Sequence, residues 1–180
     1  MKRNNTIKIT TLAALALALT AGKLTAADRE DRGQLSESDY KFVKQAARGG
    51  ITEVELGLLA QQKGNSDAVR NFGSQMAQDH KKANQELKQI ATSKGVTIPS
   101  ELSHGERSTM DKLQKATGAD FDKEYASAMV KDHKEDVKEF KKAAGDLKDP
   151  ELRAFAQKAL PTLENHLTMA EQMERSVTGK

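Results

Sequence analysis

Four long segments of the chain place apolar residues at spacings of three and four, and this period limits the possible folds more than any other feature. It puts apolar side chains along one face of an α-helix. Residues that start or stop helices bound the segments, for example Ser36 and Ser66 before a helix and Gly64 and Gly95 after one. No segment shows the alternation that is typical of a β-strand. The expected long helices cover residues 37–63, 67–94, 119–144 and 150–176.

The connections between these helices predict how they are arranged. Tight turns join the first helix to the second and the third to the fourth, so each pair should form an antiparallel hairpin. The link between the second and third helices is long and includes a short expected helix over residues 106–116. "VRNF" (69–72) opens the second helix much as "LRAF" (152–155) opens the fourth, which indicates two related hairpins. We therefore predict an all-α fold, a ferritin-like four-helix bundle whose long crossover carries a short extra helix.

The N-terminus has the layout of a secretory signal peptide. Basic residues precede an uncharged run, residues 9–22, and small residues follow it. Because a membrane-spanning helix needs about 20 apolar residues, we expect cleavage after Ala26 or Ala27 rather than a retained anchor. The predicted division is a signal peptide (1–27), a flexible N-terminal segment (28–36) and the helical bundle (37–180). The expected location is the periplasm, and association with the outer membrane stays an open alternative.

The charge that remains after cleavage bears on the partners. The chain has 29 Lys and Arg residues, four of them in the signal peptide, which leaves 25 against 26 Asp and Glu. Nucleic-acid surfaces need clustered positive charge, so no nucleic-acid partner is expected. No transmembrane segment is expected after cleavage, and the chain has no cysteine for a disulfide. The sequence identifies no protein partner and leaves a homo-oligomer open.

A repeated motif places histidines on the apolar faces of the helices. "MAQDHKKANQELKQIA" (76–91) returns 53 residues later as "MVKDHKEDVKEFKKAA" (129–144). His80, His133 and, in "LENHL", His166 occupy positions that the helical period directs toward the core. Each lies near the middle of its helix, so at about 1.5 Å rise per residue the three imidazoles should reach one level of the bundle. The charged residues that surround His133, in contrast, predict a solvated face.

The first helix offers a carboxylate for the same level. Glu53 lies on a strip of glycines and alanines that would let a neighbouring helix approach it closely. Imidazole and carboxylate ligands suit divalent Zn, Cu, Ni or Fe. We predict a metal site formed by Glu53, His80, His133 and His166, with Glu55, Asp79 and Asp132 as second choices. The alternative is a metal-free core in which the histidines bond to carboxylates and Glu53 is their counter-ion.

Stretches spread over nearly the whole mature chain resemble a known family. They include "DYKFVKQAARGGITEVELG", "GADFDKEYASAMVKDH" and "LPTLENHLTMA", in this order and spacing. The chain resembles the exported bacterial ferritin-like family called domain of unknown function 4142, whose members are often labelled outer-membrane proteins. The resemblance implies a ferritin-like bundle, and it implies neither a metal nor an activity. The residues that it carries to this chain are Glu53, Glu55, Asp79, His80, Asp122, Tyr125, His133, Pro161 and His166.

The motif that ferritins use for iron is missing. A di-iron site needs Glu-x-x-His on two helices. Three residues before His80 the chain has Ala77, and three before His166 it has Leu163, so ferroxidase activity is not expected. The sequence offers no catalytic residue, and we expect a protein that is not an enzyme. Two functions remain open: a periplasmic metal-binding module, or a metal-free envelope-stress or protein-interaction module with buried structural histidines.

Overall fold

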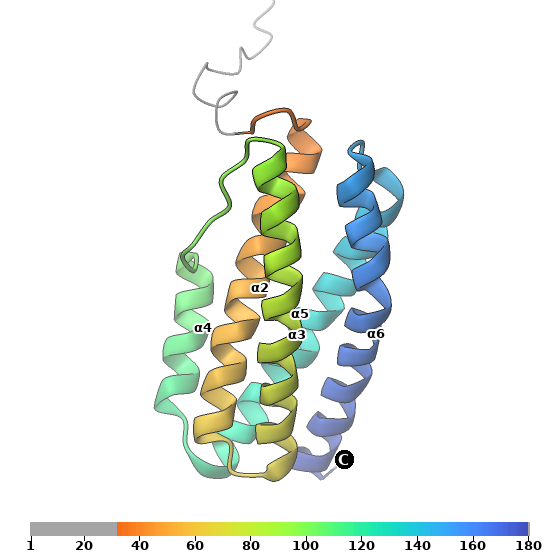
Figure 1. Ribbon diagram of the computed structural model, residues 1–180. Coiled ribbons are helices and arrows are strands. Elements are labelled where there is room, and N and C mark those ends of the chain that lie inside the picture. Colours follow the sequence, from red (N-terminus) through yellow and green to blue (C-terminus); the bar gives the residue numbers. More distant parts are fainter. Residues whose placement is uncertain (1–31, 180) are drawn as a thin grey trace, which may run out of the picture.

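The structure is a computed structural model that describes residues 32–179. These residues form five helices, and between residues 32 and 179 there is no strand. The helices are α2 (Glu37–Lys63), α3 (Asp67–Ser93), α4 (His104–Lys115), α5 (Gly118–Asp146) and α6 (Pro150–Thr178). The four long helices form a bundle, and α4 lies along its outside beside α2 (Figure 1). The predicted all-α, ferritin-like bundle with a short helix in its crossover is confirmed.

Three of the helices begin at the caps that the sequence predicts. The side chains of Ser36, Ser66 and Asp149 each accept a hydrogen bond from the backbone N–H three residues further on, at 3.2, 3.3 and 3.0 Å. Such bonds satisfy N–H groups that the first turn of a helix leaves without a partner. Local polar side chains therefore fix where α2, α3 and α6 start.

Three predicted boundaries differ from the structure by two residues, and one of them is the end of α6, which lies at Thr178 instead of residue 176. The short helix α4 begins at His104, before the expected residue 106, because Ser103 and Glu106 form a reciprocal capping box. Gly145 was expected to close the third long helix, but α5 continues through it to Asp146. Gly145 does not adopt the positive φ that would end a helix, so the helical ladder runs on to the next residue.

Two aspartates fasten the hairpins to each other. Asp39 of α2 accepts two backbone N–H groups from the turn between α5 and α6, at 2.9 and 3.2 Å. Asp122 of α5 accepts two from the turn between α2 and α3, both at 2.8 Å. Arg70 and Arg153 also form equivalent bonds, each to the carbonyl six residues before it, at 2.6 and 2.7 Å. Both pairs are 83 residues apart in the sequence, so α2 with α3 and α5 with α6 are two copies of one hairpin design.

The strip of small residues on α2 brings α3 close. A Cβ atom on Gly57 would lie 2.5 Å from the carbonyl oxygen of Gly73, and a Cβ atom on Gly73 would lie 2.6 Å from the Cβ of Ala60. Neither position can hold a larger residue without moving a helix. The strip therefore sets the distance between the two helices of the first hairpin.

The apolar core is divided into two clusters along the bundle. One cluster, around Phe42 and Phe140, lies near the start of α2, and the other, around Phe72 and Phe121, lies near its end. Between them lie buried polar side chains, among them Glu53, His133 and His166. A polar layer thus interrupts the core at the level that the sequence predicts for the histidines.

The packed structure begins before the first helix. Leu35 is buried, and the N–H of Gln34 donates to the carbonyl of Lys94 at 3.1 Å, so the end of the segment expected to be flexible (28–36) contacts the bundle. The predicted signal peptide (1–27) lies outside the described residues. No helix within residues 32–179 is long and apolar enough to cross a membrane.

Candidate metal centre

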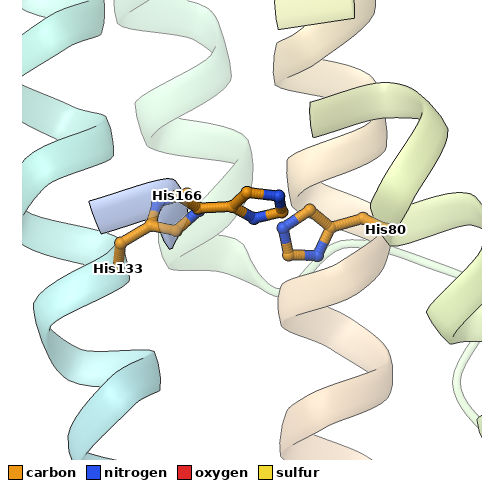
Figure 2. A group of neighbouring side chains, drawn as sticks. All are labelled: His80, His133 and His166. Carbon is orange, nitrogen blue, oxygen red and sulfur yellow. The ribbon is translucent and has the colours of Figure 1, made fainter. Parts of the chain in front are cut away.

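Three histidines from three helices meet in the middle of the bundle. His80 comes from α3, His133 from α5 and His166 from α6, and their rings point toward one another (Figure 2). The ring centroids are 5.5 to 5.9 Å apart. One nitrogen of each ring lies within 4.8 Å of the chosen nitrogen of the others. All three side chains are buried, with exposed fractions of 7%, 0% and 2%.

Hydrogen bonds to the outer nitrogens fix the tautomers of two rings. Nδ1 of His133 lies 2.9 Å from the carbonyl oxygen of Met129, and Nε2 of His166 lies 3.0 Å from Oδ2 of Asp79. Because a carbonyl or a carboxylate oxygen only accepts, each of these nitrogens carries the proton. The other nitrogen of each ring, Nε2 of His133 and Nδ1 of His166, therefore presents a lone pair.

These inner nitrogens have no hydrogen-bond partner. Nε2 of His80, Nε2 of His133 and Nδ1 of His166 are all buried and unpaired. Leaving a buried acceptor unpaired costs about 1–3 kcal/mol. The fold therefore holds three unsatisfied imidazole nitrogens close together, which a core of purely structural histidines would avoid.

The surroundings keep the imidazoles neutral. The pKa of His80 is lowered to about 3, first by burial and then by the neighbouring His133 and His166, while Asp79 opposes the shift. Burial also lowers the pKa of His133 to about 4, against the bond to Met129. The pKa of His166 is lowered by burial too, although Asp79 opposes this effect. Neutral imidazole is the form that binds metals.

A second group of possible ligands shares His133. Glu53, Asp132 and His133 each offer one ligand atom within 4.8 Å of the others. Glu53 has an exposed fraction of 0%, and neither of its oxygens accepts a hydrogen bond from a donor group. Burial raises the pKa of Glu53 well above its usual value, and a shared hydrogen bond and repulsion from Asp132 add to this rise. The carboxyl of Glu53 is therefore held protonated in the metal-free fold.

The predicted site residues thus separate into two groups. The three histidines form one group, and Glu53 joins it only through His133 and Asp132. Asp79 lies behind His166 and orients its ring. Glu55 is exposed and belongs to neither group, so this second choice is placed away from the centre.

Sequence reasoning named Asp132 as a second-choice ligand and missed Asp136. The Lys and Glu residues around His133 predicted a solvated face, but Asp132 and Asp136 are both half-buried. Burial raises the pKa of Asp136 well above its usual value, and repulsion from Asp132 adds to it. The signal was the spacing: Glu53, Asp132 and Asp136 can meet because Asp136 lies one helical turn after Asp132. The buried, unpaired hydroxyl of Tyr125, whose pKa is raised by burial and by Glu53, was also not predicted.

Comparisons with known proteins agree with this fold. The family model described as "Domain of unknown function (DUF4142)" matches residues 24–173. Among solved structures, the chain is similar to a DUF305 fragment from Deinococcus radiodurans, with a TM-score of 0.68 and 13% identity over 78% of this chain and 98% of that one. At this identity the likeness shows the fold alone. No curated protein matches the chain significantly. Because the family model covers most of its length, the chain belongs to the DUF4142 family.

Proposed function

We propose that this protein binds one divalent transition-metal ion at the centre of its bundle, through His80, His133 and His166. Glu53 and Asp132 adjoin this site only through His133, with one ligand atom each within 4.8 Å of one of its ring nitrogens. The observation that supports this proposal is the set of three buried, unpaired imidazole nitrogens that face one another.

A bound ion accounts for a cost that the metal-free alternative leaves unexplained. Structural histidines usually bond through both ring nitrogens or to water. Here the outer nitrogens of His133 and His166 are bonded and the inner ones are not. A metal ion would use all three inner lone pairs at once, because each ligand bond requires one free lone pair.

The distances suit an ion after a small closure. Zinc–nitrogen bonds of about 2.0–2.1 Å in a tetrahedral site place the nitrogens about 3.3 Å apart. One nitrogen of each ring lies within 4.8 Å of a nitrogen of each of the other two, so a small inward rotation of the rings brings three nitrogens into range. The bond between Asp79 and His166 matches the carboxylate–histidine–metal arrangement that orients many metal ligands.

The donor set limits the choice of metal. Neutral imidazole suits Zn²⁺, Cu²⁺, Ni²⁺ and Fe²⁺, and hard cations such as Mg²⁺ prefer sites made of oxygen atoms. We therefore place the ligand of this protein among the transition metals, with copper first by affinity for nitrogen ligands, and zinc beside it because three imidazoles suit tetrahedral coordination.

We further propose that the protein works in the periplasm. The support is the layout of residues 1–27, with basic residues, an uncharged run and a cleavable end. Cell fractionation with N-terminal sequencing of the mature protein tests this part. A mature chain that starts at residue 27 or 28 supports it, and an uncleaved chain in the cytoplasm contradicts it.

Isothermal titration of the untagged, chelator-treated protein with Zn²⁺ and Cu²⁺ tests the metal site. We expect one ion to bind per chain. His133→Ala should weaken this binding at least about tenfold, because it removes a ligand shared by both groups. The matched control is His104→Ala, at an exposed histidine of α4, which should bind as the wild type does. Absence of binding by the wild type would support the metal-free interaction module instead, and equal binding by His133→Ala would mean that the ion does not bind at this centre.

A further inference from the structure

A pocket of about 290 Å³ lies beside the histidine cluster, between the two hairpins. His80 and His166 line one end of it. Apolar side chains, among them Leu87, Phe140 and Phe155, line much of the rest. The pocket therefore has a polar end at the proposed metal and an apolar body away from it.

The hairpin repeat explains why this space exists. The spacing of 83 residues that relates the two hairpins pairs Gly50 with His133 and Ala83 with His166. Gly50 and Ala83 line the pocket. At the two positions where the second hairpin has His133 and His166, the first hairpin therefore has only a glycine and an alanine. The side chain of Asn84 lies against Gly50 and takes up part of the space that a symmetric pair of histidines would fill, and the pocket lies beside it.

One lining glycine is not required by packing. A Cβ atom on Gly49 would have a single neighbour within 4 Å, the Oδ1 of Asp136 at 4.0 Å. A glycine within a helix costs roughly 0.5–1 kcal/mol relative to alanine. Gly57 prevents a backbone clash, whereas the main effect of Gly49 is to keep the wall of the pocket open.

Two buried, unpaired atoms belong to side chains at the polar end. Nε2 of His80 and Nδ1 of His166 have no partner, and both side chains are more than nine-tenths buried. Three imidazoles leave a fourth tetrahedral position free on a metal ion, as in catalytic zinc sites. Because His80 and His166 line the pocket, that position can be reached from it.

We propose that this pocket binds a small molecule with an apolar body and a single nitrogen or oxygen donor, and that the donor completes the coordination of the metal. This inference rests on the proposed metal site. The donor carries no positive charge, because the ion repels a cation. The lining holds both acidic side chains, Asp79 and Asp136, and basic ones, Lys82 and Lys158, so a neutral or an anionic donor fits. The apolar body lies against the aromatic and aliphatic walls, where its burial adds affinity.

Visible spectroscopy of the Co²⁺-loaded full chain tests the proposal with two probes, imidazole and 4-phenylimidazole. Both present the same kind of donor, and only the second carries an apolar body. We expect both to change the Co²⁺ absorption bands and 4-phenylimidazole to bind at least about tenfold more tightly, since the phenyl group is buried. Metal-free protein should show no such change.

Two substitutions on α6 separate the pocket from the metal. Ala159 lines the pocket seven residues before His166, about two helical turns away, and Ala154 is exposed on the outer face. Ala159→Leu should fill the apolar end and remove the preference for 4-phenylimidazole, with Co²⁺ and imidazole binding unchanged. Ala154→Leu should retain the preference. Gly49→Ala, which adds a single methyl group to the wall, should reduce it.

The outcomes distinguish the two proposals. Failure of the wild type to bind Co²⁺ would overturn the metal site and the pocket together. Normal Co²⁺ binding with equal affinity for the two probes would overturn the pocket alone. A preference that Ala159→Leu and Gly49→Ala both leave intact would also overturn it, because the phenyl group would then lie elsewhere.

Discussion

The chemistry of His133 and His166 follows from the bond on the outer nitrogen of each ring. Met129 fixes the proton of His133 on Nδ1, and Asp79 fixes that of His166 on Nε2. Each inner nitrogen is then a bare acceptor in a buried space. At the scale of single residues, the fold thus leaves each inner nitrogen with a free lone pair. Each unpaired nitrogen lowers the free energy of unfolding relative to a core in which it has a hydrogen-bond partner.

Replacing one of the central histidines by leucine should therefore not lower the stability of the metal-free protein. For His80→Leu we expect the free energy of unfolding, measured by urea denaturation with a chelator, to stay level or rise by about 1 kcal/mol, because a buried, unpaired ring nitrogen is removed. The stabilisation by Zn²⁺ should disappear; at 100 times Kd it amounts to about 2.7 kcal/mol in the wild type. His104→Leu is the control and should retain it. A loss above about 1 kcal/mol in metal-free His80→Leu would mean that His80 has a structural partner.

Stability should depend on pH in opposite directions for two central side chains. The pKa of His133 is lowered from 6.5 to about 4, so below pH 6.5 the unfolded chain takes up a proton that the folded chain refuses, and stability falls until about pH 4. The stability of His133→Leu relative to the wild type should therefore rise as the pH falls over this range, by about 3 kcal/mol at most.

The pKa of Glu53 is raised, so above pH 4.5 the unfolded chain releases a proton that the folded chain keeps. The stability of Glu53→Gln relative to the wild type should therefore rise with pH.

Urea denaturation of the metal-free wild type and both variants between pH 4 and 8 measures these differences. A stability difference that does not change with pH for either variant would contradict the shifted pKa values of His133 and Glu53, and with them the burial of these side chains.

How far the sequence predicts the site depends on the type of residue. The helical period places His80, His133 and His166 on the apolar faces that pack into the core. Their positions near the middle of each helix then bring them to one level of the bundle. The period cannot place the carboxylates in the same way. Asp132 was a second choice and Asp136 was not predicted, because their face looks solvated in the sequence and the sequence does not show that Glu53 of α2 lies beside it.

At the scale of helices, local signals account for most of the boundaries. Ser36, Ser66 and Asp149 cap the helices that they were expected to cap. Glycine was a weaker signal, because Gly145 lies within α5 while Gly57 and Gly73 serve helix packing. The backbone conformation of a glycine depends on its tertiary neighbours, which the sequence around it does not show.

Two glycine-to-alanine substitutions should change the free energy of unfolding in different directions. Gly57→Ala should lower the free energy of unfolding by about 2 kcal/mol or more, because its Cβ would lie 2.5 Å from the Gly73 carbonyl oxygen. Gly145→Ala should be neutral or raise it by up to about 1 kcal/mol, since it has no neighbour within 4 Å and alanine favours the helix. Thermal unfolding followed by circular dichroism measures both. Equal effects would mean that α2 and α3 are not in close contact.

At the scale of the whole molecule, the bundle consists of two equivalent hairpins with an unequal centre. Asp39 and Asp122 hold the hairpins together in the same way, at opposite ends of the bundle. The apolar clusters on either side of the centre supply the stability that a buried polar layer costs. The differences between the hairpins lie at the histidines and at the small residues opposite them. The crossover and the tight turns allowed the topology to be predicted, and the pocket could not be, because it depends on side chains that are missing from one hairpin.

X-ray absorption spectroscopy of the zinc-loaded, untagged protein examines the coordination of the ion itself. We expect a first shell of nitrogen and oxygen atoms at about 2.0–2.1 Å, with the multiple-scattering pattern of three imidazoles. His80→Leu should reduce the imidazole count by one or abolish binding, and His104→Leu should leave the spectrum unchanged. A shell of oxygen atoms without imidazole scattering would contradict a metal centre built on His80, His133 and His166.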